Sequence, residues 1–305
     1  MEKKPLIQQG WMRALLYIII GMPLGLGLYL ITDLLINGAY TTDKGTVAVP
    51  VFTFLQQYVL STYGLVLTAF IFRVLIDKQS VFSLGFAWKG YRTDAWTGFF
   101  TAMMILFVGS LILVLTKHLY FTNAFFNIKN FFTGIVLFIV VAFAEEIIVR
   151  GYILNNLLHS MNKWWALIIS AAVFAALHLS NDNIHWLSIA NIFVAGLLLG
   201  VNYIYTHNLW FGIFMHFGWN FFQGLVLGYN VSGNGIEPGS SIMQQTIIGS
   251  EFLTGGKFGF EGSVLCPALL LLMFFVFVWE YERRKKRAEH DTEYAKAMAE
   301  LHELN

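Results

Sequence analysis

Long apolar runs dominate this sequence and restrict the solvent in which the chain can fold. A helix that crosses a bilayer needs about 20 mostly apolar residues, and on that criterion we count about eight candidates. They begin near Ala14, Val51, Trp96, Phe131, Trp164, Ile184, Leu209 and Val264. Charged residues make up only 12% of the chain, where a soluble domain carries roughly 25%. The sequence therefore predicts an all-α fold, a polytopic transmembrane helical bundle of about eight spans.

The links between most of these runs are short, which favours one bundle over several independent domains. We divide the chain into three segments. Residues 1–130 hold the first spans and an aromatic, basic stretch typical of a membrane interface. Residues 131–228 hold the core spans, and residues 229–305 hold a glycine-rich loop, the last span and a basic tail. We expect the loop to fold over the outer end of the bundle and the tail to be a cytoplasmic helix.

The basic residues predict how the chain is oriented. With eight spans, the three clusters of basic residues fall on one side of the membrane, which the positive-inside rule identifies as the cytoplasm. These clusters are Lys3, Lys4 and Arg13; Arg73, Lys78, Lys89 and Arg92; and Arg283, Arg284, Lys285, Lys286 and Arg287. Both termini are then cytoplasmic. Outside the tail the sequence shows no basic face, so we expect no nucleic-acid partner. The single cysteine, Cys266, excludes an internal disulfide.

The fourth apolar run contains AEEIIVRG, which places Glu145, Glu146 and Arg150 in a lipid-spanning helix. Ionisable residues inside a membrane are costly and most often functional. Glu146 and Arg150 are four residues apart and share a helix face, so they can form an ion pair. Glu145 points about 100° away from Glu146 and remains free for another role. The alternative is that all three residues form a buried salt-bridge cluster that only fixes helix packing.

Two further spans carry histidines. FAALH ends at His178, and HFGWN holds His216 and Asn220 one turn apart on the same face. A lone histidine near a span end is most often simply hydrogen-bonded. Together with Glu145, however, these residues are the inventory for activating a water and stabilising an oxyanion. Glu145, His178 and His216 could equally bind a divalent metal, because two imidazoles and a carboxylate match a hydrolytic zinc site. Both interpretations predict hydrolysis.

Three motifs now stand in order on successive helices: EEIIVR fits EExxxR, FAALH fits FxxxH, and HFGWN fits HxxxN. In this the chain resembles the CAAX-protease and bacteriocin-processing family of intramembrane endopeptidases, also called the Abi family. The resemblance covers roughly Phe131 to Leu227. The stretch LTGGKFGFEGS is also similar to a loop of bacterial members of the family.

The resemblance implies a role for each motif residue. Glu145 would be the general base, with His178 positioning the water or binding a metal. His216 and Asn220 would polarise the scissile carbonyl and stabilise the developing oxyanion. The supporting residues would be the ion pair Glu146 and Arg150, together with Phe174, which would pack beside the site.

The resemblance leaves the cofactor open, because members are described both as zinc or other metal proteases and as metal-free glutamate enzymes. It implies a multi-pass protein of a bacterial plasma membrane, with lipid and a peptide or protein substrate, lipidated or not, as partners. Two other functions remain. A non-catalytic scaffold or partner-binding protein would be marked by a broken motif, and a transporter by inverted repeats or interrupted helices in matching halves. The sequence shows neither sign.

Overall fold

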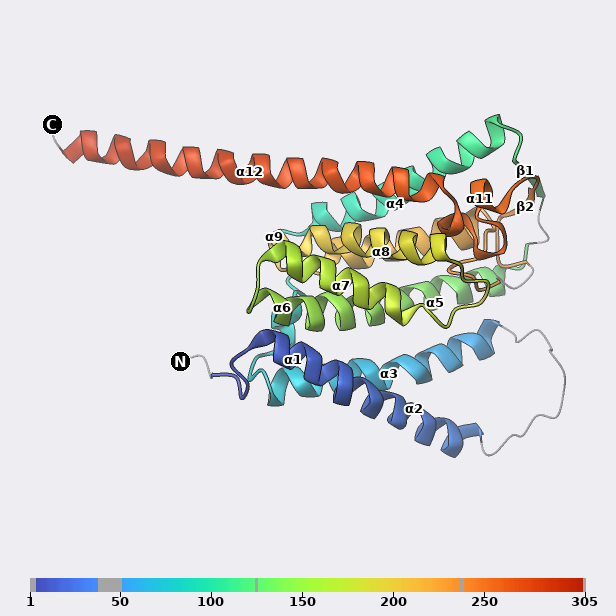
Figure 1. Cartoon of the computed structure of the whole chain (residues 1–305), viewed down its shortest axis with the longest axis horizontal. Helices are drawn as coiled ribbons and strands as arrows, with labels where there is room; N and C mark the ends of the chain where they lie inside the picture. The colour runs from blue at the N-terminus through green and yellow to red at the C-terminus, as the bar shows by residue number, and fades with distance from the viewer. Residues whose placement is uncertain (1–3, 38–50, 124–125, 236–238, 304–305) are drawn as a thin grey trace.

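The structure is a computed structural model that describes residues 4–37, 51–123, 126–235 and 239–303. Its long helices lie side by side in one bundle, as Figure 1 shows, and the predicted all-α fold is confirmed. The longer helices are α1 (Gly10–Leu16), α2 (Met22–Asn37), α3 (Val51–Leu75), α4 (Arg92–Leu115), α5 (Ile128–Glu146), α7 (Lys163–Leu177), α8 (Trp186–Val201), α10 (Trp210–Asn220) and α12 (Leu265–Glu303).

Short elements connect these helices. Three π-helical segments continue α1, α5 and α10, and three 3-10 turns and three short α-helices lie in the connections. They are η1 (Tyr17–Gly21), η2 (Val81–Leu84), η3 (Ile147–Leu154), α6 (Asn155–Leu158), α9 (Tyr203–Thr206), η4 (Phe221–Val226), α11 (Glu251–Thr254), η5 (Gly256–Phe258) and η6 (Phe260–Gly262).

Within the described ranges, six helical segments are long and apolar enough to cross a membrane. They are Gly10–Thr32, Tyr58–Leu75, Arg92–Leu115, Ile128–Leu158, Trp186–Thr206 and Leu265–Glu293. The fourth is the longest, as its extended apolar run predicted. The two remaining candidates, which begin near Trp164 and Leu209, correspond to the shorter helices α7 and α10. The chain is an integral membrane protein, and six of its eight predicted spans meet the length and apolarity of a crossing helix.

The beginning of α1 and the C-terminal end of α12 lie at the same end of the bundle (Figure 1). At the other end, strand β1 (Leu119–Asn123) pairs antiparallel with β2 (Met243–Ile247), with Leu119 opposite Ile247. This pairing ties the connection between α4 and α5 to the glycine-rich loop. The sequence predicted that the loop folds over the bundle, but it gave no sign of a strand pair.

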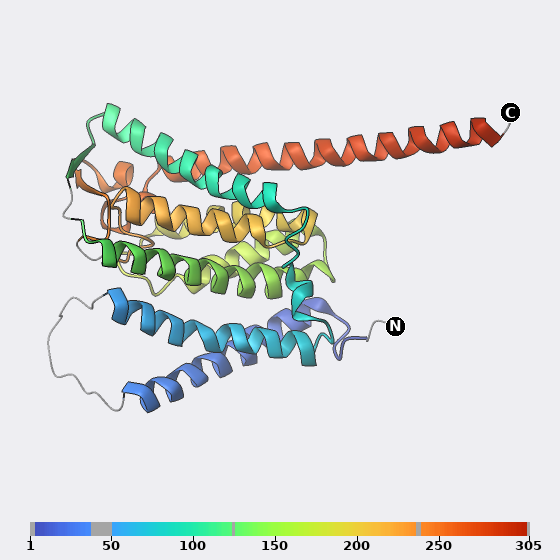
Figure 2. The ribbon, with the colours of Figure 1, turned by 180° about the vertical axis from the view of Figure 1, so that it is seen from behind.

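The core contains α10, which lies between α4 and α5 in Figure 2 and packs against both. The contact with α4 is close at Gly98, where a Cβ atom would lie 2.4 Å from the carbonyl oxygen of Phe211. The largest buried cluster draws on all three segments of the chain, for example through Tyr17, Ile148 and Phe260. Helix α10, which carries one of the three motifs, is therefore held from two sides.

A buried polar cluster fastens the first helices to the rest of the bundle. Asp77 follows α3 and accepts hydrogen bonds from Arg73 (2.9 Å) and from the Asn156 side chain of α6 (3.1 Å). The hydroxyl of Tyr152 donates to the other carboxylate oxygen of Asp77 at 3.3 Å, and Arg13 of α1 lies 3.6 Å from it. Helices α1 and α3 are thus fixed to the end of the helix that begins as α5.

Candidate active site

The two adjacent glutamates lie at the end of α5, near the middle of the bundle. Glu146 is fully buried, and its Oε1 accepts a hydrogen bond from Arg150 at 2.8 Å. The same oxygen is 3.1 Å from Nδ1 of His216. The ion pair that the helical spacing predicted is therefore present. It also holds a histidine of a second motif, because α10 comes close to Glu146. A Cβ atom at Gly212 of α10 would lie 2.6 Å from Oε2 of Glu146.

Arg150 joins three helices through its guanidinium group. Besides bonding Glu146, it donates to the backbone carbonyl of Gly196 in α8 at 2.9 Å. The face of the guanidinium lies 4.4 Å from the ring centroid of Phe174 in α7. The Phe174 ring also contacts both imidazoles, with centroids 4.7 Å from His178 and 6.0 Å from His216. Phe174 therefore lies beside the site, at the position that the motif implied.

Glu145 points away from Glu146 and toward the two histidines. Its Oε2 lies 3.7 Å from Nε2 of His178 and 3.9 Å from Nε2 of His216. Both distances are too long for a direct hydrogen bond. This oxygen is buried and has no hydrogen-bond partner, whereas Oε1 accepts a 2.8 Å bond from the hydroxyl of Tyr58. The structure thus leaves one carboxylate oxygen free between two imidazole nitrogens.

Hydrogen bonds on the far side of each ring fix which imidazole nitrogen faces Glu145. Nδ1 of His178 lies 2.8 Å from the backbone carbonyl of Phe174, which can only accept, so Nδ1 carries the proton. Nδ1 of His216 faces the carboxylate of Glu146 and carries a proton for the same reason. In the neutral rings both Nε2 atoms are therefore acceptors. A water between them and Glu145 would have an acceptor for each of its protons.

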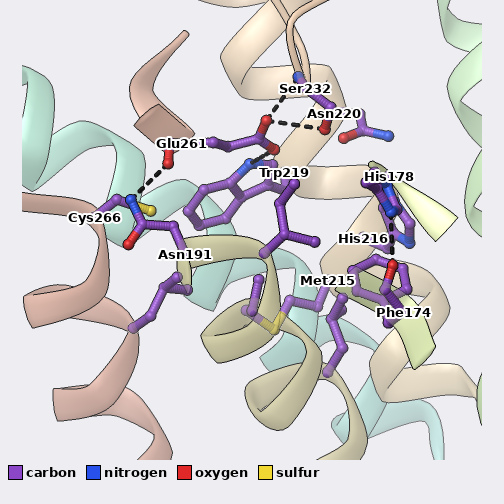
Figure 3. Close-up of a pocket in the computed structure, with 14 residues that line it drawn as sticks. Phe174, His178, Asn191, Met215, His216, Trp219, Asn220, Ser232, Glu261 and Cys266 are labelled. Atoms are coloured by element: carbon purple, nitrogen blue, oxygen red, sulfur yellow. Dashed lines mark hydrogen bonds between the residues drawn. The ribbon is translucent and has the colours of Figure 1, made fainter. Parts of the chain in front are cut away.

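Asn220 lies one turn after His216, and both line a buried cavity of about 40 Å³. Figure 3 shows His178 and His216 beside Asn220, with Glu261 to the left of Asn220 and bonded to Ser232. A single water needs roughly 10–15 Å³ of such a volume, so the cavity has room for a few waters. Glu145 does not line the cavity and approaches the imidazoles from their other side. The four predicted catalytic residues are thus brought together, with the imidazoles between the carboxylate and the cavity.

The glycine-rich loop supplies a second acid to the same cavity. Glu261 of η6 accepts hydrogen bonds from the Trp219 indole (2.8 Å), the Ser232 backbone (2.6 Å) and the Ser232 hydroxyl (2.9 Å). Burial raises the pKa of Glu261 above its usual range, while these donors partly offset that rise. The Asn191 side chain of α8 donates to the backbone carbonyls of Glu261 and Ser263 at 2.7 and 2.8 Å. The loop is therefore the outer wall of the cavity.

The sequence did not identify Tyr58, Trp219 or Glu261. Tyr58 is one of 13 tyrosines and lies in a span without a motif, so no local pattern marks it. Glu261 lies within LTGGKFGFEGS, and an acid among closely spaced glycines was the one available signal. Asn191 is an isolated polar residue of its span, and its bonds to the loop backbone give it a structural role.

A metal would have to bind the same three donors. Two ligands on one tetrahedral zinc, each about 2.0–2.1 Å from the ion, lie roughly 3.3 Å apart. The separations of 3.7 and 3.9 Å are wider. Across the described residues, no group of three His, Cys, Asp or Glu side chains is arranged to hold a metal ion. As arranged, the three donors do not fit zinc. Metal binding at this site stays a prediction.

Comparison with known proteins gives one match. Residues 127–222 match the family model described as "Type II CAAX prenyl endopeptidase Rce1-like". This segment contains all three motifs and confirms the resemblance to the CAAX-protease and bacteriocin-processing family. No curated protein and no solved structure matches the chain. Tyr58 and Glu261 lie outside the matched segment.

Proposed function

We propose that this chain is an intramembrane endopeptidase that hydrolyses a peptide bond with a water activated by Glu145. The observation that carries the proposal is the free Oε2 of Glu145, which faces the Nε2 atoms of His178 and His216. The match to an endopeptidase family over residues 127–222 supports the same reaction class. Oε2 of Glu146 also has no hydrogen-bond partner, so what distinguishes Glu145 is that its free oxygen faces two imidazole nitrogens.

In the proposed reaction, one water bonds to both Oε2 of Glu145 and Nε2 of His178. The water oxygen bonds to the carbonyl carbon of the substrate while Oε2 of Glu145 takes one water proton. The carbonyl oxygen becomes an oxyanion, which the amide of Asn220 and Nε2–H of His216 stabilise by donating hydrogen bonds. The carbon–nitrogen bond then breaks, and Glu145 gives its proton to the leaving nitrogen. The products are a carboxylic acid and an amine.

For His216 to donate from Nε2 while Nδ1 bonds Glu146, the ring must be the imidazolium. The buried charges favour that form. Glu145 and Glu146 carry two negative charges, and Arg150 carries one positive charge. A proton on His216 brings the cluster to zero net charge, and a buried cluster of zero net charge avoids the cost of an unpaired ion. We propose that His216 acts as this cation and His178 as the neutral ring.

The test is comparative peptidomics of membranes that contain the wild-type chain or the Glu145→Gln variant. Gln has nearly the shape of Glu but cannot take a proton. We expect the variant to insert and fold normally and to lose processing of its substrate by at least about a hundredfold. Glu251→Gln, at an exposed position of α11, is the matched control and should behave as wild type. Retained processing by Glu145→Gln would refute the proposal.

The name of the matched family suggests a substrate class, a protein that ends in a prenylated CAAX sequence. We propose a membrane-associated peptide as the substrate, and the lipid is tested by a second experiment. Two internally quenched peptides with the same CAAX sequence, one farnesylated and one not, are offered to the purified chain in lipid nanodiscs. Cleavage of the farnesylated peptide alone would assign a lipidated substrate. A metal analysis of the same preparation tests the predicted zinc.

A further inference from the structure

Helix α3 brings a side chain into the site from outside the motif segment. The hydroxyl of Tyr58 lies 2.8 Å from Oε1 of Glu145, 87 residues away in the sequence. A carboxylate only accepts, so the phenol donates this hydrogen bond. Among the described residues, no other hydrogen bond reaches the Glu145 carboxylate. The orientation of the proposed base therefore depends on a helix to which sequence analysis gave no role.

The bond determines which oxygen of Glu145 faces the histidines. Rotation about the last side-chain bond of a glutamate is nearly free, so an untethered carboxylate would sample many orientations. With Oε1 held by Tyr58, Oε2 points at Nε2 of His178 and His216. A hydrogen bond to a charged acceptor is also among the stronger interactions in a protein interior. Tyr58 is thus placed to fix the aim of the base.

The backbone around Tyr58 is held as well. Its carbonyl accepts hydrogen bonds from the hydroxyls of Ser61 (2.9 Å) and Thr62 (2.7 Å). Six residues farther along α3, the backbone meets α2, since a Cβ atom at Gly64 would lie 2.2 Å from the carbonyl oxygen of Gly25. Helix α3 therefore packs between α2 and α5. In Figure 2 these helices follow one another from the lower edge of the bundle toward its centre.

We propose that Tyr58 is a positioning residue of the active site, and that the first helices of the chain complete the site by holding Glu145 through it. This inference rests on the proposed function. It gives the segment that precedes the family match a part in the reaction, besides its part in the bundle. If Tyr58 only connected α3 to α5, removal of its hydroxyl would lower the stability of the chain but would not specifically lower turnover.

The experiment compares Tyr58→Phe with Tyr63→Phe in the full chain in lipid nanodiscs. Each variant removes one partly buried hydroxyl from α3. The hydroxyl of Tyr63 bonds the carbonyl of Leu28 and the hydroxyl of Thr32, away from the site. The probe is an internally quenched peptide. It spans the bond that the wild-type chain cleaves and that the Glu145→Gln variant leaves intact. We expect Tyr58→Phe to lower kcat about tenfold to a hundredfold with KM within about twofold of wild type. Tyr63→Phe should keep the wild-type kcat.

Thermal unfolding of both variants is measured alongside turnover, so that a folding defect is separated from a catalytic one. Wild-type kcat in Tyr58→Phe, with Glu145→Gln inactive, would overturn the inference and leave the proposed function in place. Equal losses of kcat and stability in both tyrosine variants would also overturn it, in favour of a structural tie. Activity in Glu145→Gln would instead contradict the proposed function itself.

Discussion

Glu145 and Glu146 are neighbours in the chain, yet their carboxylates have different partners. Glu146 is enclosed by Arg150, His216 and the close approach of Gly212, and its side chain is 0% exposed. Each carboxylate has one bonded and one free oxygen, but the free oxygen of Glu145 faces His178 and His216, and its side chain is 21% exposed. The difference follows from the helix, since successive residues point about 100° apart. One glutamate is therefore committed to the structure and the other is available to a water.

Replacing Arg150 with Met tests the structural half of this pair. Arg150 is buried and neutralises Glu146, so its loss leaves a buried carboxylate with its guanidinium partner gone. We expect a destabilisation of roughly 3–5 kcal/mol and a low yield of folded protein. The measurement is thermal unfolding in detergent, together with the recovered monodisperse fraction. Lys163→Met is the control, because its ion pair with Glu282 is partly exposed and should matter far less. An Arg150 variant as stable as wild type would contradict the ion-pair argument.

At this scale the sequence could predict whatever depends on helical spacing or on a motif. The pairing of Glu146 with Arg150 follows from four residues of separation, and the assembly of Glu145, His178 and His216 follows from three motifs on successive helices. Tyr58 could not be predicted, because its contact with Glu145 depends on how α3 packs against α5. No spacing along the chain encodes that packing.

Among the elements, two π-helical segments stand out by their positions. η3 begins one residue after Glu146, and η4 begins one residue after Asn220. Such wide turns are rare, and they occur frequently at functional sites. Each π-helical segment changes the direction in which the side chains after it point, relative to a regular α-helix. The sequence predicted continuous helices here, because apolar periodicity does not distinguish a π-turn from an α-turn in a run that is apolar on all sides.

The glycine-rich loop, which carries Glu261, is an element whose stability should depend on pH. Burial raises the pKa of Glu261 above its ordinary value of 4.5, so the folded chain binds the proton more tightly than the unfolded chain. The stabilisation is complete below that value and is lost as pH rises through the folded pKa. We expect wild-type unfolding temperatures, measured from pH 4 upward, to fall relative to those of Glu261→Gln. Glu251→Gln should follow the wild type, and parallel curves for all three would contradict the assignment.

For the whole molecule, the arrangement of the ends gives a topology that can be measured. The beginning of α1 and the end of α12 lie at one end of the bundle, and the β1–β2 pair lies at the other (Figure 1). Basic residues cluster at the end with the termini, so we predict that this end lies in the cytoplasm. The glycine-rich loop then faces outward, so the cavity wall that it forms is the wall farthest from the cytoplasm.

Single introduced cysteines test this orientation. The native Cys266 is 1% exposed and should not react with a membrane-impermeant maleimide. Ile248→Cys, at a position 55% exposed beyond β2, should label in intact cells. Glu289→Cys, on the exposed part of α12, should label only after the cells are permeabilised. The reverse pattern would mean that the termini lie outside.

The fold was predictable at this scale because apolar length alone reports a crossing helix. The number of spans was less so. Helix α7 has 15 residues, and α10 has 11 residues followed by the six of η4. Both lengths are short for a crossing helix. Both carry site residues. Helix α10 lies inside the bundle, where neighbouring helices take the place of lipid, whereas α7 keeps an exposed apolar face that includes Trp165 and Ile168. A count based on hydrophobic length cannot tell a helix that faces lipid from one that other helices cover.

Helix α12 has one further consequence. Its 39 residues make a rod about 58 Å long, nearly twice the thickness of a bilayer's hydrocarbon core (about 30 Å). The basic run Arg283 to Arg287 comes first after the bundle and lies within reach of anionic headgroups. The end of the helix at Glu303 lies about 24 Å farther along the axis, about three times the Debye length of roughly 8 Å. The acidic end of the rod, which includes Glu300 and Glu303, therefore lies beyond the reach of the negative surface potential of the membrane.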